Sequence, residues 1–141
     1  MWQLGNEIRI SVLRLTARPR LATRFKARDQ INDATNSVCR NIAEGFSAES
    51  HGEFVRYLGI ARNSLNELLD SLEGARLEGL VSNDDLAPIH VLARRQFKAM
   101  STFIAYLIRS DKAHRLRRKQ ARGGSDRAGT DRNSPDRTDK R

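Results

Sequence analysis

The spacing of apolar residues predicts long helices along the first hundred residues of the chain. Between residues 53 and 75, apolar side chains recur at alternating steps of four and three, the spacing of a coiled-coil-like seam over three heptads. The seam consists of Phe54, Leu58, Ala61, Leu65, Leu68, Leu72 and Ala75. Shorter stretches before it follow the same pattern: Leu4, Ile8, Val12 and Leu15 in one, and Ile31, Thr35, Val38 and Ile42 in the next. No segment alternates with the period of two that is typical of a strand.

Local signals place the ends of the first predicted helices. The first helix runs from about Trp2 to Thr16, before Pro19. The second covers roughly residues 23–44, and Gly45 is a natural residue to end it. The pattern Ser50-x-x-Glu53 is a capping box and predicts the start of a third helix over roughly residues 52–78.

The third helix is expected to end at a left-handed glycine, and a fourth begins soon after it. Gly79 can supply the left-handed residue of a Schellman motif, with Leu80 folding back on the end of the helix. The Ser82 hydroxyl can cap the amide of Asp85, and the fourth helix then continues to about His114 or into the arginines that follow.

These elements predict an all-α fold, an antiparallel up-down-up-down four-helix bundle with a disordered basic C-terminal tail. The chain has 141 residues, one domain's worth, and connections this short force consecutive helices to fold back on each other. We expect residues 1–114 to form the bundle domain and residues 115–141 to form a basic, mostly disordered tail. From residue 123 onward the tail has no large apolar side chain with which to form a core.

Basic residues are concentrated just after the predicted bundle. The formal net charge is +9, but residues 1–114 carry 16 basic and 13 acidic side chains. Residues 115–122 add five cations and no acid: Arg115, Arg117, Arg118, Lys119 and Arg122, here called the arginine run. One or two cations would complement a helix dipole, whereas five in eight residues favour contact with phosphates. Contact with a membrane or an acidic protein, or a role in solubility alone, are the alternatives.

A second basic set surrounds the connection between the first two predicted helices. It consists of Arg14, Arg18, Arg20, Arg24, Lys26 and Arg28. The set could form a second nucleic-acid patch, and a solvated surface is an equal alternative. The phenylalanines mostly fall on predicted core stripes, so few rings are expected to stack on bases. Any RNA contact should therefore be directed at the backbone and depend little on sequence.

The sequence offers no catalytic or metal-binding set. Asn41 and Glu44 have no nucleophile, second acid or histidine at a useful spacing, so a structural role such as a cap or an ion pair is expected for Glu44. No cofactor is implied.

The single Cys39 excludes an internal disulfide, fits a reducing cytoplasm and is expected to be a small buried side chain. No stretch is apolar enough to predict a membrane span.

The second and third predicted helices resemble a known bacterial family. The resemblance covers residues 2–108, and Asn41-Ile42-Ala43-Glu44-Gly45 is its most specific part, followed by Glu53-Phe54. On these residues the chain is similar to the four-helix-bundle proteins associated with intervening sequences of 23S ribosomal RNA. The arginine run lies outside the family pattern.

The resemblance implies partners as well as a fold. It implies a homo-oligomeric ring, commonly a pentamer, with no established catalytic activity, and ribosomal RNA as the nucleic acid. Related bundles serve as accessory subunits of reverse transcriptases in diversity-generating retroelements, which is the alternative function. Gly59 and Gly74, inside the third predicted helix, suggest close backbone approach to the second helix or to a neighbouring subunit.

Overall fold

The structure, a computed structural model, describes the backbone of residues 1–125 and the side chains of residues 1–122. Over this range the chain forms α1 (Trp2–Thr16), α2 (Pro19–Ala22), α3 (Phe25–Phe46), α4 (His51–Leu77) and α5 (Asn83–Ser125), and residues 1–125 include no strand. The chain divides into two units, Met1–Ile108 and Arg109–Arg141. Most of the predicted disordered segment, residues 126–141, lies outside the described residues.

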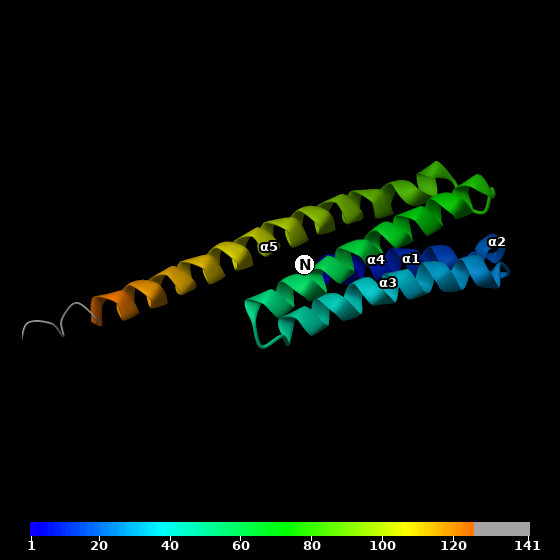
Figure 1. Ribbon diagram of the computed structural model, residues 1–141. Helices are drawn as coiled ribbons and strands as arrows, with labels where there is room; N and C mark the ends of the chain where they lie inside the picture. Colours follow the sequence, from blue (N-terminus) through cyan, green and yellow to red (C-terminus); the bar gives the residue numbers. More distant parts are fainter. Residues whose placement is uncertain (126–141) are drawn as a thin grey trace, which may run out of the picture. The chain divides into compact units, whose positions relative to one another are not determined.

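The unit Met1–Ile108 is the predicted antiparallel bundle. Helices α1, α3, α4 and the first part of α5 run in alternating directions (Figure 1). The four-residue helix α2 in the connection between α1 and α3 was not predicted. It begins at Pro19, whose fixed φ suits the first position of a helix and whose missing N–H is not needed there. The all-α, up-down-up-down prediction is confirmed.

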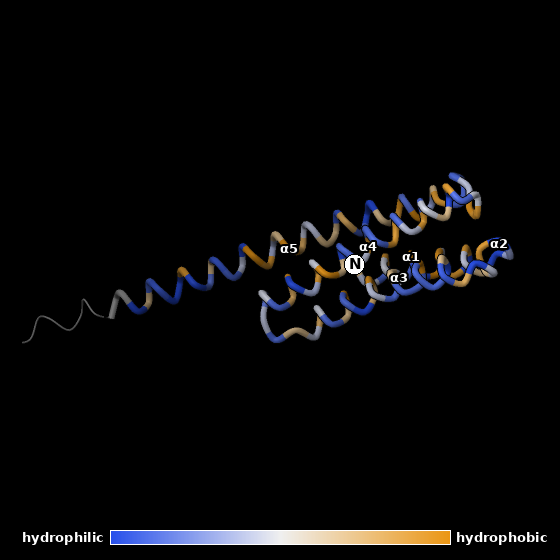
Figure 2. Tube along the Cα trace, turned by 45° about the vertical axis from the view of Figure 1, so that its right-hand side comes forward, coloured by the Kyte–Doolittle hydropathy of each residue, from blue (hydrophilic) through white to orange (hydrophobic). Residues whose placement is uncertain are grey.

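The predicted apolar stripes form the core of this unit. Hydrophobic residues recur at intervals along each helix in Figure 2. Every position of the α4 seam is buried except Phe54, which is partly buried against the same core. The stripes of α1 and α3 add the buried residues Ile8, Val12, Leu15, Ile31, Val38 and Ile42. Helix α5 contributes the buried residues Leu86, Ile89, Ala93, Met100 and Leu107. Burial of these helix faces supplies most of the stability of the helices.

Side-chain caps fix where α4 begins. The Ser50 hydroxyl accepts a hydrogen bond from the Glu53 backbone N–H at 3.1 Å, as the capping box predicted. The Glu53 carboxylate accepts from the backbone N–H of Glu49 at 3.2 Å, one residue earlier than the standard box. Two backbone donors at this turn are therefore satisfied by side chains.

The connection from α4 to α5 has the predicted Schellman motif and a second cap. Gly79 has a φ of +72°, and the Leu80 N–H donates to the Ala75 carbonyl oxygen at 2.9 Å. The Asp85 N–H donates to the Ser82 hydroxyl at 3.2 Å, and the Ser82 N–H donates to the Asp85 carboxylate at 2.9 Å. This reciprocal pair turns the chain into α5.

The role predicted for Gly45 as a helix-ending residue is wrong, and the structure gives it a packing role. Helix α3 continues to Phe46, and Gly45 does not have a positive φ. A Cβ atom at Gly45 would lie 2.5 Å from the ring of Phe54 on α4, so only glycine fits beneath that ring. In contrast, Cβ atoms at Gly59 and Gly74 would meet nothing within 4 Å in the described residues, which excludes the predicted approach of α3.

One core position of α5 is polar without compensation. Gln96 is 0% exposed, and neither of its side-chain amide atoms has a hydrogen-bond partner among the described residues. The ring of Phe54 lies 5.1 Å from that of Phe103. Two turns along each antiparallel helix from that pair lead to Ala61 and Gln96. Helical spacing thus predicts that the small Ala61 side chain faces Gln96.

Replacing Gln96 should stabilise the bundle. Because a buried amide without a hydrogen bond costs about 1–3 kcal/mol, Gln96→Leu is expected to raise the free energy of unfolding by that order. Urea unfolding followed by circular dichroism measures the change. Gln3→Leu, at an exposed position of α1, is the matched control and should change stability by no more than about 0.5 kcal/mol. A loss of stability in Gln96→Leu would show that the amide is satisfied.

Candidate nucleic-acid interface

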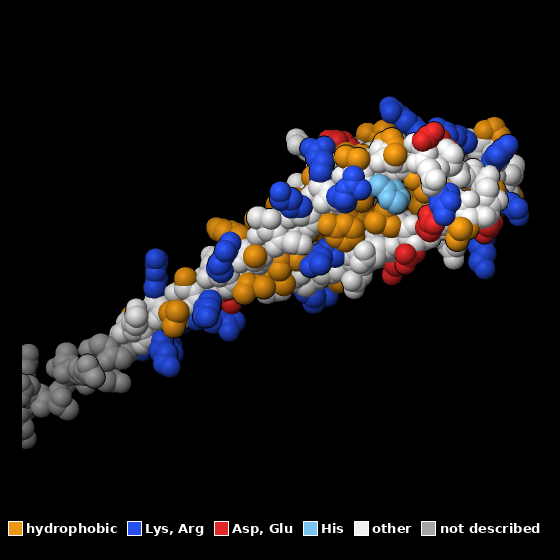
Figure 3. Space-filling view, turned by 90° about the horizontal axis from the view of Figure 1, so that it is seen from above, with side chains coloured by type: hydrophobic (Ala, Val, Ile, Leu, Met, Phe, Trp, Pro, Cys, Tyr) orange, Lys and Arg blue, Asp and Glu red, His pale blue; other side chains and the backbone are white. Residues whose placement is uncertain are grey.

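The arginine run is part of helix α5. All five of its side chains are exposed, and the helix extends without interruption to Ser125. At 100° per residue, Arg115, Arg118, Lys119 and Arg122 fall within an arc of about 100° on one side of the helix. Lys and Arg side chains follow α5 on the face shown in Figure 3. The helical continuation that this spacing required is therefore present.

Among the described side chains, Arg115 is the one member of the arginine run that forms an ion pair. Its guanidinium lies 3.0 Å from the Asp111 carboxylate, one turn earlier, and Arg115 stays 80% exposed. An exposed ion pair of this kind contributes little to stability and is screened by salt. The guanidinium therefore remains available to a phosphate, which it can bind through two hydrogen bonds.

Part of the second basic set is engaged within the bundle. Arg18 pairs with the Asp85 carboxylate, and the Arg20 guanidinium donates to the Gly79 carbonyl oxygen at 3.5 Å. The Ser82 backbone N–H, assisted by Arg18, lowers the pKa of Asp85 to about 2. These two arginines thus connect the end of α1 and helix α2 to the turn between α4 and α5.

The rest of the second set consists of Arg28, which has partners near its own helix, and three exposed cations. Arg28 donates to Asp29 at 2.9 Å and to the Ala22 carbonyl oxygen at 3.3 Å. Arg14, Arg24 and Lys26 are exposed. The set therefore separates into three arginines with intramolecular partners and three exposed cations, of which Arg24 and Lys26 lie at the start of α3.

Comparison with known proteins identifies the family. The sequence profile described as 23S rRNA-intervening sequence protein matches residues 1–101. The chain belongs to this family. A solved structure, a protein of unknown function from the S23 ribosomal protein family of Bacteroides thetaiotaomicron, is 22% identical with a TM-score of 0.66. The match covers 73% of this chain and 96% of that one, and it shows a shared fold. No curated protein matched the chain.

The family match ends before the arginine run. Residues 102–141, including all five cations, lie beyond the matched range. The family match therefore covers most of the bundle, and the chemistry of the run depends on its own residues.

Within the run on which the family resemblance was based, Asn41 has structural contacts and Glu44 has no ion pair among the described side chains. Asn41 is buried, and its amide donates to the Ser37 carbonyl oxygen at 2.8 Å. The Ser37 hydroxyl in turn lies 2.7 Å from the Ser64 hydroxyl on α4. Glu44 is exposed, and among the described side chains it has no ion pair. The ion pair expected for Glu44 across the turn is therefore absent among the described side chains. An ion pair between Glu44 and a second subunit stays a prediction.

Most phenylalanines were expected on core stripes, but two of the five are exposed. Phe25 and Phe46, the first and last residues of α3, are 64% and 56% exposed. Phe46 still packs against the rings of Phe54 and Phe103, with centroids 5.0 and 6.4 Å away. Periodicity could not reveal this, because both residues lie at helix ends, where the core stripe stops.

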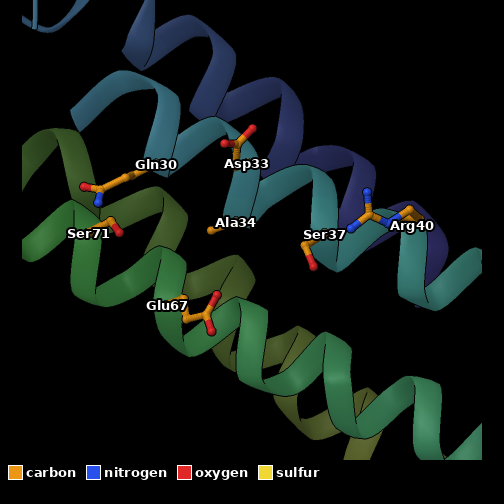
Figure 4. Close-up of a pocket in the computed structure, with 7 residues that line it drawn as sticks. All are labelled: Gln30, Asp33, Ala34, Ser37, Arg40, Glu67 and Ser71. Atoms are coloured by element: carbon orange, nitrogen blue, oxygen red, sulfur yellow. The ribbon is translucent and has the colours of Figure 1, made fainter. Parts of the chain in front are cut away.

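The polar groove between α3 and α4 is the feature closest to an enzyme site (Figure 4). It has a volume of about 510 Å³ and is lined by Gln30, Asp33, Ala34, Ser37, Arg40, Glu67 and Ser71. These lining residues include no histidine or cysteine to act as base or nucleophile, and the Ser37 hydroxyl bonds to Ser64. The lining of the groove therefore has no histidine that could act as a base and activate Ser37 or Ser71 as a nucleophile.

Metal, thiol and membrane chemistry find little support in the described residues. No group of three or more His, Cys, Asp or Glu side chains among them is arranged to hold a metal ion. Cys39 is half-buried, its thiol donates to the Gly5 carbonyl oxygen at 3.4 Å, and burial raises its pKa. The thiol is thus poorly ionised and weakly reactive. None of the described helices has an apolar stretch long enough to span a bilayer.

Proposed function

We propose that this chain is a non-enzymatic, homo-oligomeric protein of the cytoplasm that binds RNA through phosphate contacts. The observation that carries the proposal is the arginine run on α5, in which four of five exposed cations share one side of a helix. Arginine forks pair with phosphate oxygens in two hydrogen bonds, and each neutralised phosphate releases counterions. The family supports ribosomal RNA as the polyanion.

The number and placement of the cations favour a polyanion over the dipole of α5. The dipole acts within the last turn of a helix, where one or two cations are enough. The run instead spans two turns and has one internal acid partner, Asp111, among the described side chains. Because its contacts are to phosphates, binding should depend strongly on salt and weakly on sequence.

Exposed apolar residues on α1 support self-association. Trp2, Ile10 and Leu13 are exposed, and helical spacing places them on the side of α1 opposite its buried stripe. The opposite side of α1 already packs in the core through Ile8 and Val12. The exposed apolar side is therefore suited to a contact with another subunit. We propose a ring, a pentamer by family resemblance, that would repeat the basic surfaces around one assembly.

RNA binding by the full chain and by a chain ending at His114 tests the proposal. At low ionic strength the full chain should bind a ribosomal RNA fragment, and the shortened chain should bind it many times more weakly. Light scattering on the same samples should give a mass several times that of one chain for both. Equal RNA affinity of the two chains would contradict the role of the run, and a monomeric mass would contradict the ring.

A further inference from the structure

The start of α3 places an exposed aromatic ring among cations. Phe25 is 64% exposed and lies between Arg24 and Lys26, both exposed as well. The guanidinium of Arg28 lies 5.0 Å from the centre of the Phe25 ring. Two hydrogen bonds to Asp29, at 3.0 and 2.9 Å, hold that guanidinium in place. One face of the ring is thus already covered by a cation.

The Phe25 ring also lines a cavity of mixed chemistry. The cavity has a volume of about 570 Å³, within the usual range of small-ligand sites. Its lining includes Thr23, Arg24, Phe25, Lys26, Gln30 and Glu78. The wall therefore combines an aromatic face, two cations, an amide and one carboxylate, drawn from the start of α3 and the end of α4.

These groups match the parts of a nucleotide. A base can stack on the Phe25 ring, and Arg24 and Lys26 can hold the phosphate beside it. The amide of Gln30 can both donate to and accept from a base edge, and the Glu78 carboxylate can accept from a base amino or imino group. Since the carboxylate would repel a phosphate, the phosphate belongs on the Arg24 and Lys26 side.

We infer that this cavity binds one unpaired nucleotide of an RNA strand, with its base stacked on the Phe25 ring face opposite the Arg28 guanidinium. The inference rests on the proposed function, because it assigns a specific site to the RNA that the arginine run attracts. Bases in a duplex are stacked on both faces and cannot reach an aromatic side chain, so the site selects single-stranded RNA. The Phe25 ring thus supplies an aromatic platform for a base, although few such rings were predicted from the sequence.

Phe25→Ala tests the site, with Phe46→Ala as the matched control at the other end of the same helix. Each protein is titrated with a short fluorescent oligouridylate and with an RNA hairpin duplex of similar length. Phe25→Ala should weaken binding of the single strand about 5- to 150-fold and leave duplex affinity unchanged. Phe46→Ala should change neither affinity. Equal effects of the two substitutions on the single strand would overturn the inference.

A fluorescence measurement checks the stack directly. In a Trp2→Phe background, Phe25→Trp keeps the platform and becomes the only tryptophan, so its emission should be quenched when the oligouridylate binds. Unquenched emission at saturation would overturn the inference and leave phosphate binding by the arginine run intact. Absence of binding by the unmodified chain to both RNAs at low salt would instead overturn the proposed function, and the nucleotide site with it.

Discussion

Replacing all five cations of the arginine run with glutamine is expected to reduce the slope of log affinity for RNA against log salt by about 3.5 to 4.5. Each phosphate contact contributes roughly 0.7 to this slope for a single strand and 0.9 for a duplex, because each releases condensed counterions. The run has five exposed cations on one helix, each able to make one such contact. The measurement is a titration of RNA at several salt concentrations, from about 50 to 200 mM.

The difference in slope also means that the five-glutamine chain loses less RNA affinity, relative to the unmodified chain, as the salt concentration rises. A slope of about 3.5 to 4.5 corresponds to a change of roughly 10²- to 10³-fold over that fourfold range of salt. The five-glutamine chain should therefore bind far more weakly at the low end and approach the unmodified chain at the high end. Glutamine keeps the helix propensity of the segment, so a loss of helix is not expected to contribute.

A second variant with the same net charge distinguishes phosphate contacts of the arginine run from general attraction of RNA to a basic protein. Glutamine at five other exposed or partly exposed cations lowers the net charge by the same amount: Arg56, Arg62, Arg76, Arg94 and Arg95. At physiological salt the screening length is about 8 Å, so charges away from the contact surface should matter little. If both variants lost the same slope, RNA binding would reflect the net charge of the chain, and the run would have no special role.

The fold could be predicted from the sequence because helical periodicity and caps are local signals. The α4 seam, the Ser50 and Ser82 caps and the left-handed Gly79 each depend on residues within one or two turns. The role of Gly45 could not be predicted in the same way. Its constraint comes from the ring of Phe54 on the next helix, and a glycine near a helix end usually indicates termination.

The candidate site was predicted only in part for the same reason. The arginine run is a contiguous feature, so its charge and helical side follow from the sequence. The intramolecular partners of Arg18 and Arg20 do not follow from the sequence, because Asp85 and Gly79 lie 67 and 59 residues away in the chain. The exposure of Phe25 likewise depends on where the core ends, which periodicity does not define.

Leu65→Asp is expected to abolish the folded bundle. Leu65 is 0% exposed, and one turn away on the same face lie Ala61 and Leu68, both also 0% exposed. An aspartate there would lose the burial of a leucine, about 2–5 kcal/mol, and would either bury an unpaired charge or take up a proton at further cost. Natural domains are stable by only about 5–15 kcal/mol.

Circular dichroism and urea unfolding measure the effect, and the adjacent residue provides the control. Asn66→Asp introduces the same side chain one position along α4, where it is exposed, and should change the free energy of unfolding by no more than about 0.5 kcal/mol. Both variants change the net charge equally, so a difference between them reports burial alone. A soluble Leu65→Asp chain with unaltered helicity and unfolding midpoint would mean that the α4 seam does not face the core.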